Sequence, residues 1–425
     1  MTDAGRSLAA AANAMVDLRA TLLAETGTDG VALDSLAGRV LAADVVADED
    51  VPPHSRATMD GVALDAGDDP PLSVAEGTLA PGDDPADHDP GTARRIATGA
   101  PLPVGADAVV PREDATVEDG RLASVPVASG DHVVRRGSVV TAGETVLSAG
   151  RRLAPRDAAL LADLGRETVA VRERLSAAIL ATGTEIHEGR EPDRDSAFLA
   201  NLVRAWGGAP VLAGSVPDDS ARVGERVRSL ADGHDVVLTT GGTGVSDTDE
   251  TRETLGGRPD VRVSDVAVRP GSNSTVAWLA DAGATVVSLP GPPGAAFASA
   301  TLLARPLFVG RSHASTIAGT MACDLPVPDR DLTFVVPVEL HERRSADGGR
   351  GSPTGGEGRA DNPDDPRVVP FGHPTSTVEL YDDRFQPHRV ATCARLSAAD
   401  GVVLTDEGLH ADDRVAVRPY AVVES

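Results

Sequence analysis

The chain has 425 residues, and its 39 basic residues against 65 Asp and Glu give a formal net charge of −26. This length exceeds what one hydrophobic core usually supports, so the sequence predicts several domains. Every basic residue is arginine, because the sequence contains no lysine. The missing ammonium group excludes a Walker-type phosphate loop, a pyridoxal phosphate Schiff base and a Ser-x-x-Lys acylation pair.

Acidic residues are spread along the whole chain, which argues against nucleic acid and against an anionic membrane surface as partners. An acidic chain without lysine is typical of a salt-adapted, halophile-like protein. Cys323 and Cys393 form no CxxC motif, so neither a disulfide framework nor a thiolate metal site is indicated. The first residues lack a signal-peptide pattern, and no run approaches the ~18 apolar residues of a membrane span. We therefore expect a cytoplasmic protein.

In chain order, apolar spacing predicts a first helix over residues 5–24, and Asp34 with Ser35 can cap a second short helix that runs to Leu41. Short apolar stretches between Gly, Pro and Asp clusters then predict an inserted β-rich domain. After Arg174, apolar strands such as LSAAILATG and DVVLTT alternate with helices over 196–206, 219–230 and 294–307, where Ser196 is the expected cap of the first. This alternation predicts a central αβα sandwich with a mostly parallel sheet.

The sequence thus predicts a multidomain α/β chain with smaller β-rich domains. The predicted domains are an N-terminal helix (1–24) packed on the central domain, a discontinuous linking domain (25–45 and 140–174), an inserted β-rich domain (46–139), the α/β domain (175–320), and a C-terminal β domain (321–425) with a mobile loop at 343–366.

Ligands of such sheets bind beyond the carboxyl ends of the strands, which points to three loops. In TTGGTGVSDTD (239–249), glycines can turn N–H groups toward an anion, and Asp247 and Asp249 could hold a hard cation; a plain tight turn is the alternative. ATGTE places Glu185 at the same edge, and SLPGPPGAAF (288–297) is either an anion-binding or a purely structural turn.

Two further motifs have a functional and a structural interpretation. Asp195 and Ser196 could pair with the N–H groups of a heterocycle, or could simply cap the helix that follows. Asp60 lies in the loop of SRATMDGVALD, where an Asp before Gly is most often a turn residue. The sequence has no HExxH motif and no GxSxG elbow, which are the signatures of zinc peptidases and serine hydrolases.

In their order along the chain, these motifs closely resemble the MoeA-type molybdopterin molybdenumtransferases, the family that includes the E domain of gephyrin. The resemblance covers about residues 5–310, and a weaker similarity is found in RLSAADGVVL (395–404). It rests on GRVLAADVVADEDVPPHSRATMDGVAL, TGAPLPVGADAVV, RRG, ATGTE, DVVLTTGGTGVSDTD, VRPG and LPG.

The resemblance implies an elongated multidomain chain that forms a homodimer of four-domain subunits, whose cleft binds adenylylated molybdopterin and molybdate. With Mg²⁺ or another divalent cation, the family inserts molybdenum into the dithiolene and releases AMP. A molybdopterin adenylyltransferase is a further partner that the resemblance suggests.

The residues that match the family's positions fall into three groups. Catalytic roles are implied for Asp60, Glu185, Asp247 and Asp249, of which Asp60, Asp247 and Asp249 would hold the metal. Binding of the molybdopterin nucleotide is implied for Thr98, Asp195, Ser196, Gly241, Gly242, Thr243, Gly271, Ser272, Pro290 and Gly291.

The chain departs from the family at several of these motifs. The family's PGKP is PGSN at 270–273, and its PGNPVS is PGPPGA at 290–295, so Pro292 and Ala295 replace an asparagine and an anion-binding serine. RRGED has become RRGSV, MDGYA reads MDGVA, and Ala197 replaces an asparagine. Molybdate insertion is the leading hypothesis. The alternative is a divergent paralogue that binds molybdopterin nucleotide or handles tungstate without efficient insertion, and a scaffold role ranks third.

Overall fold

The computed structural model describes residues 7–123, 126–241, 255, 259–264, 266–342 and 365–424. The chain divides into two compact units, one of residues Met1–Gly27 with Glu173–Ser425 and the other of residues Thr28–Arg172. Because only two units are separated, the five domain boundaries proposed above stay predictions. Most of the predicted 343–366 loop lies outside the described residues.

The first unit is built around a six-stranded sheet in the order β14-β13-β15-β19-β18-β16. Strands β13, β14, β15 and β19 are mutually parallel, and β18 runs antiparallel to both β19 and β16. The predicted mostly parallel sheet is therefore confirmed. Its strands are β13 (Ser176–Thr182), β14 (Ala209–Val216), β15 (Val236–Thr240), β16 (Asp260–Val263), β18 (Thr275–Leu279) and β19 (Ala284–Leu289).

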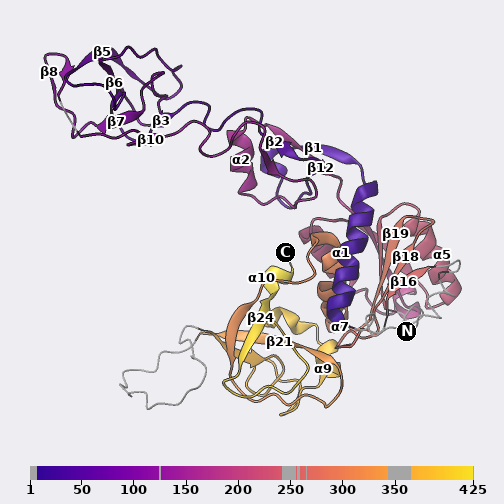
Figure 1. Ribbon diagram of the computed structural model, residues 1–425. Coiled ribbons are helices and arrows are strands. Elements are labelled where there is room, and N and C mark those ends of the chain that lie inside the picture. Colours follow the sequence, from indigo (N-terminus) through magenta and orange to yellow (C-terminus); the bar gives the residue numbers. More distant parts are fainter. Residues whose placement is uncertain are drawn as a thin grey trace, which may run out of the picture. The chain divides into compact units, whose positions relative to one another are not determined.

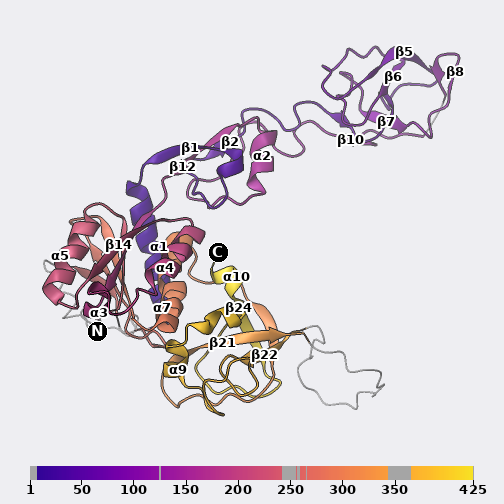
Figure 2. The same cartoon turned by 180° about the vertical axis from the view of Figure 1, so that it is seen from behind.

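Alternating side chains of these strands build two cores, one on each face of the sheet. Ala177 and Ile179 pack with the helices of one face, whereas Ala178 and Leu180 pack against α5 (Ser220–Ala231) on the other. Figures 1 and 2 show α5 on one side of the sheet and α1 on the opposite side. The helices of the α1 face are α1 (Leu8–Glu25), α4 (Ser196–Ala205), α7 (Pro293–Ser299), the π-helix η3 (Ala300–Ala304) and α8 (Arg305–Val309).

The C-terminal part of the first unit is a small barrel. Its sheet has the order β17-β21-β22-β20-β24-β23, and an additional pairing of β21 with β23 closes it. The barrel encloses its own apolar core, which includes Phe334 and Phe385. Its elements are β17 (Val268–Arg269), β20 (Ile317–Met321), β21 (Thr333–His341), β22 (Arg367–Pro370), β23 (Gly401–Thr405) and β24 (Arg414–Pro419), with α9 (Pro387–Ala391), η4 (Arg395–Ala398) and α10 (Tyr420–Val423).

The second unit consists of short strands around three apolar clusters. Its largest sheet has six strands in the order β7-β4-β6-β5-β9-β8. These are β4 (Gly61–Leu64), β5 (Leu72–Leu79), β6 (Thr92–Ile96), β7 (Ala108–Pro111), β8 (Val117–Glu118) and β9 (Arg121–Leu122). The other elements are β1 (Thr28–Ala32), β2 (Val45–Val46), β3 (Arg56–Ala57), β10 (Val133–Val134), β11 (Thr145–Leu147), β12 (Thr168–Arg172), η2 (Leu33–Ser35) and α2 (Asp157–Asp163).

One of two local predictions needs correction. The short helix expected to run to Leu41 is only the 3₁₀ turn η2, because Gly38 takes a φ of +76° and turns the chain out of the helical path. The first helix, predicted over 5–24, runs over Leu8–Glu25 and is confirmed within the described residues.

The chain enters and leaves the second unit at adjacent points. Thr28 and Arg172 are partners at one end of the antiparallel pair β1 and β12. On the side of the first unit, the N–H of Glu173 donates a 3.0 Å hydrogen bond to the carbonyl oxygen of Gly27. The point where the chain enters the second unit and the point where it leaves therefore lie side by side.

Candidate functional site

The carboxyl ends of β13, β15 and β19 form one edge of the central sheet, as predicted. Gly241, directly after β15, has a φ of +79°, and a Cβ added there would lie 2.4 Å from the carbonyl oxygen of Thr182. A Cβ at Gly291, after β19, would lie 3.2 Å from the Cα of Gly241. Side chains at these two positions would push the loops apart, so both glycines are needed for the loops to meet at this edge.

Asp195 and Ser196 stand at the start of α4, but their side chains do not cap it. The cap is Asp193, whose Oδ1 accepts hydrogen bonds from the N–H groups of Asp195 and Ser196 at 3.1 and 3.0 Å. The prediction that Ser196 caps the helix is therefore wrong, since Asp193 is also an acceptor and lies closer to these N–H groups. This leaves both side chains available for another purpose.

Within the part of the chain that the structure describes, one hydrogen bond holds the Asp195 carboxyl group. The hydroxyl of Thr240, the last residue of β15, donates a 2.6 Å hydrogen bond to its Oδ2. Oδ1 of Asp195 and Oγ of Ser196 are buried and have no hydrogen-bond partner among the described residues. Buried polar atoms are almost always paired, and these two neighbouring acceptors at the ligand edge of the sheet are left without a partner by the described residues.

Burial also changes the protonation of this carboxyl group. Asp195 is only 8% exposed, and its burial, with the negative charge of Asp193, raises its pKa above the usual range of Asp, although the Thr240 hydrogen bond acts in the opposite direction. Perturbed carboxyl groups of this kind occur preferentially at functional sites.

Glu185 lies beside the same edge, in the short helix α3 (Thr184–His187) that follows β13. Its side chain is exposed and folds back over Gly183, where an added Cβ would lie 2.9 Å from Oε1. The structure thus brings Glu185, Asp195, Ser196, Gly241 and Gly291 to one edge, as predicted.

A cavity of about 550 Å³ lies between this edge and the barrel. We call it the Ser272 cavity. The predicted residues Gly271, Ser272 and Pro290 line it, together with Arg269, Pro270, Asn273, Pro292, Ala295, Pro328, Arg330, Leu332, Phe334, Pro387, His388, Ala391 and Thr392. None of the lining residues is Asp or Glu, although acidic residues are the commonest charged residues of the chain. The cavity is therefore a cationic region within an acidic protein.

The wall that carries His388 comes from close packing of two helices. A Cβ at Gly294, in α7, would lie 2.6 Å from the carbonyl oxygen of Val390 in α9. Gly294 occupies the place of the valine in the family's PGNPVS motif. The glycine therefore permits a close approach of α9 to α7.

In the second unit the structure brings two predicted residues together. Asp60 Oδ1 accepts 2.8 Å hydrogen bonds from both the N–H and the hydroxyl of Thr98. These bonds, with a smaller contribution from the charge of Arg112, lower the pKa of Asp60. The exposed carboxylate stays ionised and is suited to a hard cation.

Four predicted residues, Gly242, Thr243, Asp247 and Asp249, lie outside the described residues. In the described part of the chain, no group of three or more His, Cys, Asp or Glu side chains could hold a metal ion. The same part contains no helix with the length and hydropathy of a membrane span.

Sequence reasoning missed Thr240, Arg269, Arg330 and His388. Thr240 lies inside the DVVLTTGGTGVSDTD motif, but no pattern in the sequence distinguishes it as a functional residue. His388 and Arg330 come from the barrel, and no periodicity or spacing in the sequence indicates that these segments pack beside PGSN. Only the residues of the central domain could be placed from the strand order.

Two family models match the chain. Residues 6–165 match the MoeA N-terminal region (domain I and II), and residues 178–309 match a probable molybdopterin binding domain. These matches define a protein that joins a MoeA N-terminal region to a molybdopterin-binding α/β domain.

Relatives and solved structures agree with this class. A molybdopterin molybdenumtransferase 2 of Mycobacterium tuberculosis is 34% identical over 301 residues, which are 65% of this chain and 73% of the relative. The molybdopterin molybdenumtransferase of Bacillus subtilis is 32% identical over 343 residues, 74% of this chain and 79% of the relative. The crystal structure of a molybdopterin biosynthesis MoeA protein from Pyrococcus horikosii has a TM-score of 0.67 and 25% identity, and the match covers 96% of this chain and 98% of that one. The chain belongs to the molybdopterin molybdenumtransferase family.

Proposed function

We propose that this chain is a transferase of molybdenum cofactor biosynthesis that inserts molybdate into adenylylated molybdopterin and releases AMP. The proposal is supported by a pair of buried acceptors at the carboxyl edge of the sheet, Asp195 Oδ1 and Ser196 Oγ, which no described residue pairs. A pterin offers N–H donors to such acceptors. The relatives are named as transferases, which favours insertion over the binding-only paralogue considered from the sequence.

The two substrates would occupy adjoining parts of the first unit. Asp195 and Ser196 would receive the pterin, and the glycine loop that begins at Gly241 would hold phosphate with its N–H groups. The oxoanion would enter the Ser272 cavity, which begins where β18 starts beside the end of β19, since Thr275 pairs with Ser288.

Molybdate binding in this cavity requires positive charge, and the family's lysine is absent. Arg269, Arg330 and His388 line the cavity and supply donors in its place. Arginine offers a planar fork of N–H groups that suits oxoanions. The replacement of the family's lysine and serine is thus offset by side chains from the barrel and from β17.

Mg²⁺ or another divalent cation, when bound, would neutralise charge on the diphosphate. Asp60 has the ionised, hydroxyl-supported carboxylate that such an ion prefers, and Asp247 and Asp249 are its expected co-ligands. In a homodimer, Asp60 of the partner subunit would serve this role. We further propose a cytoplasmic location and a molybdopterin adenylyltransferase as the partner that delivers the nucleotide.

The test is AMP release from adenylylated molybdopterin by the full-length protein, in high salt with Mg²⁺ and molybdate. We expect AMP release only when molybdate is present, and a parallel titration with tungstate defines the oxoanion preference. Saturable nucleotide binding without AMP release would overturn insertion and support the binding-only paralogue.

Arg330→Gln tests the oxoanion cavity. Because a charge-assisted hydrogen bond contributes about 1.5–3 kcal/mol, we expect the molybdate concentration for half-maximal rate to rise by about tenfold or more. Arg384→Gln is the matched control, because Arg384 is an exposed arginine of the same barrel that does not line the cavity. An equal effect of both variants would assign the change to net charge alone.

A further inference from the structure

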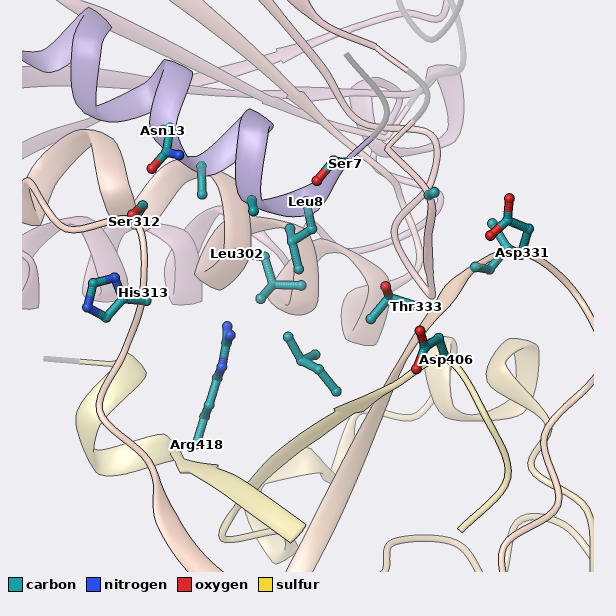
Figure 3. A pocket seen from close by; sticks show the side chains of 15 residues that line it. Ser7, Leu8, Asn13, Leu302, Ser312, His313, Asp331, Thr333, Asp406 and Arg418 are labelled. Atoms are coloured by element: carbon teal, nitrogen blue, oxygen red, sulfur yellow. The ribbon is translucent and has the colours of Figure 1, made fainter. Parts of the chain in front are cut away.

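A second cavity of the first unit, of about 500 Å³, lies on the other side of the chain that leads into β21. We call it the Arg418 cavity, and Figure 3 shows it from close by. Arg330 and Phe334 line the Ser272 cavity, whereas Asp331 and Thr333 line the Arg418 cavity, and Leu332 touches both. Residues 330–334 line both cavities in this way, so this one segment separates them.

The position of Arg418 follows from strand alternation. Val415 and Val417 of β24 are buried in the barrel core. Arg418 therefore points away from that core, and Figure 3 shows its side chain rising from β24 into the middle of the cavity. Its guanidinium is partly buried, and the burial lowers its pKa.

This guanidinium has no side-chain hydrogen bond or ion pair within the described residues. Asp331 and Asp406 line the same cavity, but they lie at its far end in Figure 3, and neither is paired with Arg418. A partly desolvated charge without a partner is costly. In a chain with 65 acidic residues and 39 basic ones, an arginine that faces a cavity and has no carboxylate partner among the described residues is positioned to receive one from a ligand.

Apolar side chains form part of the wall around Arg418. Leu8 and Ala12 of α1, Leu302 of η3 and Leu404 of β23 contribute to them. Ser312 and His313 add hydrogen-bonding groups on the side opposite the two aspartates. A ligand that fits has one anionic end for the arginine and an aliphatic body for the leucines. The aspartates at the far end disfavour a second negative charge.

We propose that the Arg418 cavity binds a small aliphatic monocarboxylate, with its carboxylate paired to the guanidinium. A cavity of this size is within the range of small-molecule sites. Apart from Leu332, which lines both cavities, none of its residues belongs to the proposed molybdopterin and molybdate sites, so this site is separate from the transferase reaction.

Isothermal titration of the full-length protein with valerate at constant ionic strength tests the proposal, with pentanol and inorganic phosphate as comparison ligands. We expect saturable binding of valerate, no binding of pentanol, and weaker binding of phosphate. Arg418→Gln should weaken valerate binding by about tenfold or more, since it removes a charge-assisted bidentate contact. Ala9→Leu, which fills the apolar part from α1 and keeps the arginine, should weaken binding as well.

The matched control is Arg311→Gln, which removes the same charge from an exposed arginine close in sequence to His313 but outside the cavity lining. It should leave valerate affinity unchanged. Both arginine variants should keep the molybdate-dependent release of AMP, and this separates the proposal from the proposed function. Absence of saturable valerate binding, equal binding by Arg418→Gln, or tighter binding of phosphate than of valerate would each overturn the proposal.

Discussion

The hydroxyl of Thr240 donates a 2.6 Å hydrogen bond to Oδ2 of Asp195 and so ties the start of α4 to the end of β15. It orients a buried carboxyl group whose second oxygen has no partner among the described residues. The contact makes Thr240 a positioning residue for the proposed pterin site.

Thr240→Val tests this role. The variant keeps the shape of the side chain but removes the donor, so the Asp195 carboxyl can rotate in its pocket. We expect the KM for adenylylated molybdopterin to rise by about tenfold, because one hydrogen bond to a charged group contributes about 1.5–3 kcal/mol, while kcat changes less. Thr285→Val is the control, since the Thr285 hydroxyl is buried in the same sheet, no residue in the described ranges bonds it, and its loss should be neutral. If the KM stays constant in Thr240→Val, the positioning role is wrong.

Asp195→Asn should change how stability depends on pH. The raised pKa of Asp195 means that the folded protein holds a proton which the unfolded chain releases at lower pH. The free energy of unfolding contributed by this group is therefore highest below the pKa of unfolded Asp, about 3.9, and falls as pH rises through the folded pKa. The Asn variant should lack this fall. Urea unfolding at a series of pH values measures it, and parallel curves for both proteins would contradict the prediction.

Asp60→Asn should leave the fold intact and remove cation-dependent activity. The amide oxygen can still accept both Thr98 hydrogen bonds, but the negative charge is gone. We expect an unchanged melting temperature and a loss of AMP release of about a hundredfold or more, because metal assistance is worth several kcal/mol. Asp65→Asn, which alters a turn carboxylate bonded to the Gly67 N–H in the same unit, should retain activity. Full activity in Asp60→Asn would remove Asp60 from the metal site.

Gly294→Ala should disturb the Ser272 cavity through α9. The new methyl group would meet the carbonyl oxygens of Val390 and Ala391 at 2.6 and 2.9 Å, so the helices must separate. We expect a loss of about 1–3 kcal/mol in the free energy of unfolding and weaker molybdate binding, since His388 lies on α9. Gly233→Ala, where an added Cβ has nothing within 4 Å, is the neutral control. An unchanged free energy of unfolding in Gly294→Ala would show that α9 can move away from α7 without loss of stability.

Glu339 should contribute stability that acid removes. It is only 3% exposed, and although burial alone would raise its pKa, hydrogen bonds from Ser376 and Thr377 outweigh burial and lower it. Its contribution to the free energy of unfolding is therefore present above the pKa of unfolded Glu and lost as pH falls through the folded pKa. Glu339→Gln should cost about 1–3 kcal/mol near neutral pH and less in acid. A pH-independent difference between the two proteins would contradict this assignment.

Local patterns predicted the central domain well because its strands are continuous apolar runs and its turns carry glycine. The strand order then placed Glu185, Asp195 and Gly241 at one edge. Capping was mispredicted because Asp193, Asp195 and Ser196 are all competent acceptors, and only the geometry decides among them. The contributions of Arg330 and His388 depend on packing between segments far apart in the chain, which leaves no periodic signal in the sequence.

The hydrogen bond between Glu173 and Gly27, with Thr28 opposite Arg172, means that the second unit is a single excursion which departs and returns at neighbouring positions. An inserted unit of this kind can be lengthened, exchanged between homologues, or removed and replaced by a short linker. None of these changes alters the strand connections of the central sheet. The first unit, with its α/β domain and barrel, and the second unit are thus separable evolutionary modules. The junction between them is a natural place to divide the chain in recombinant proteins.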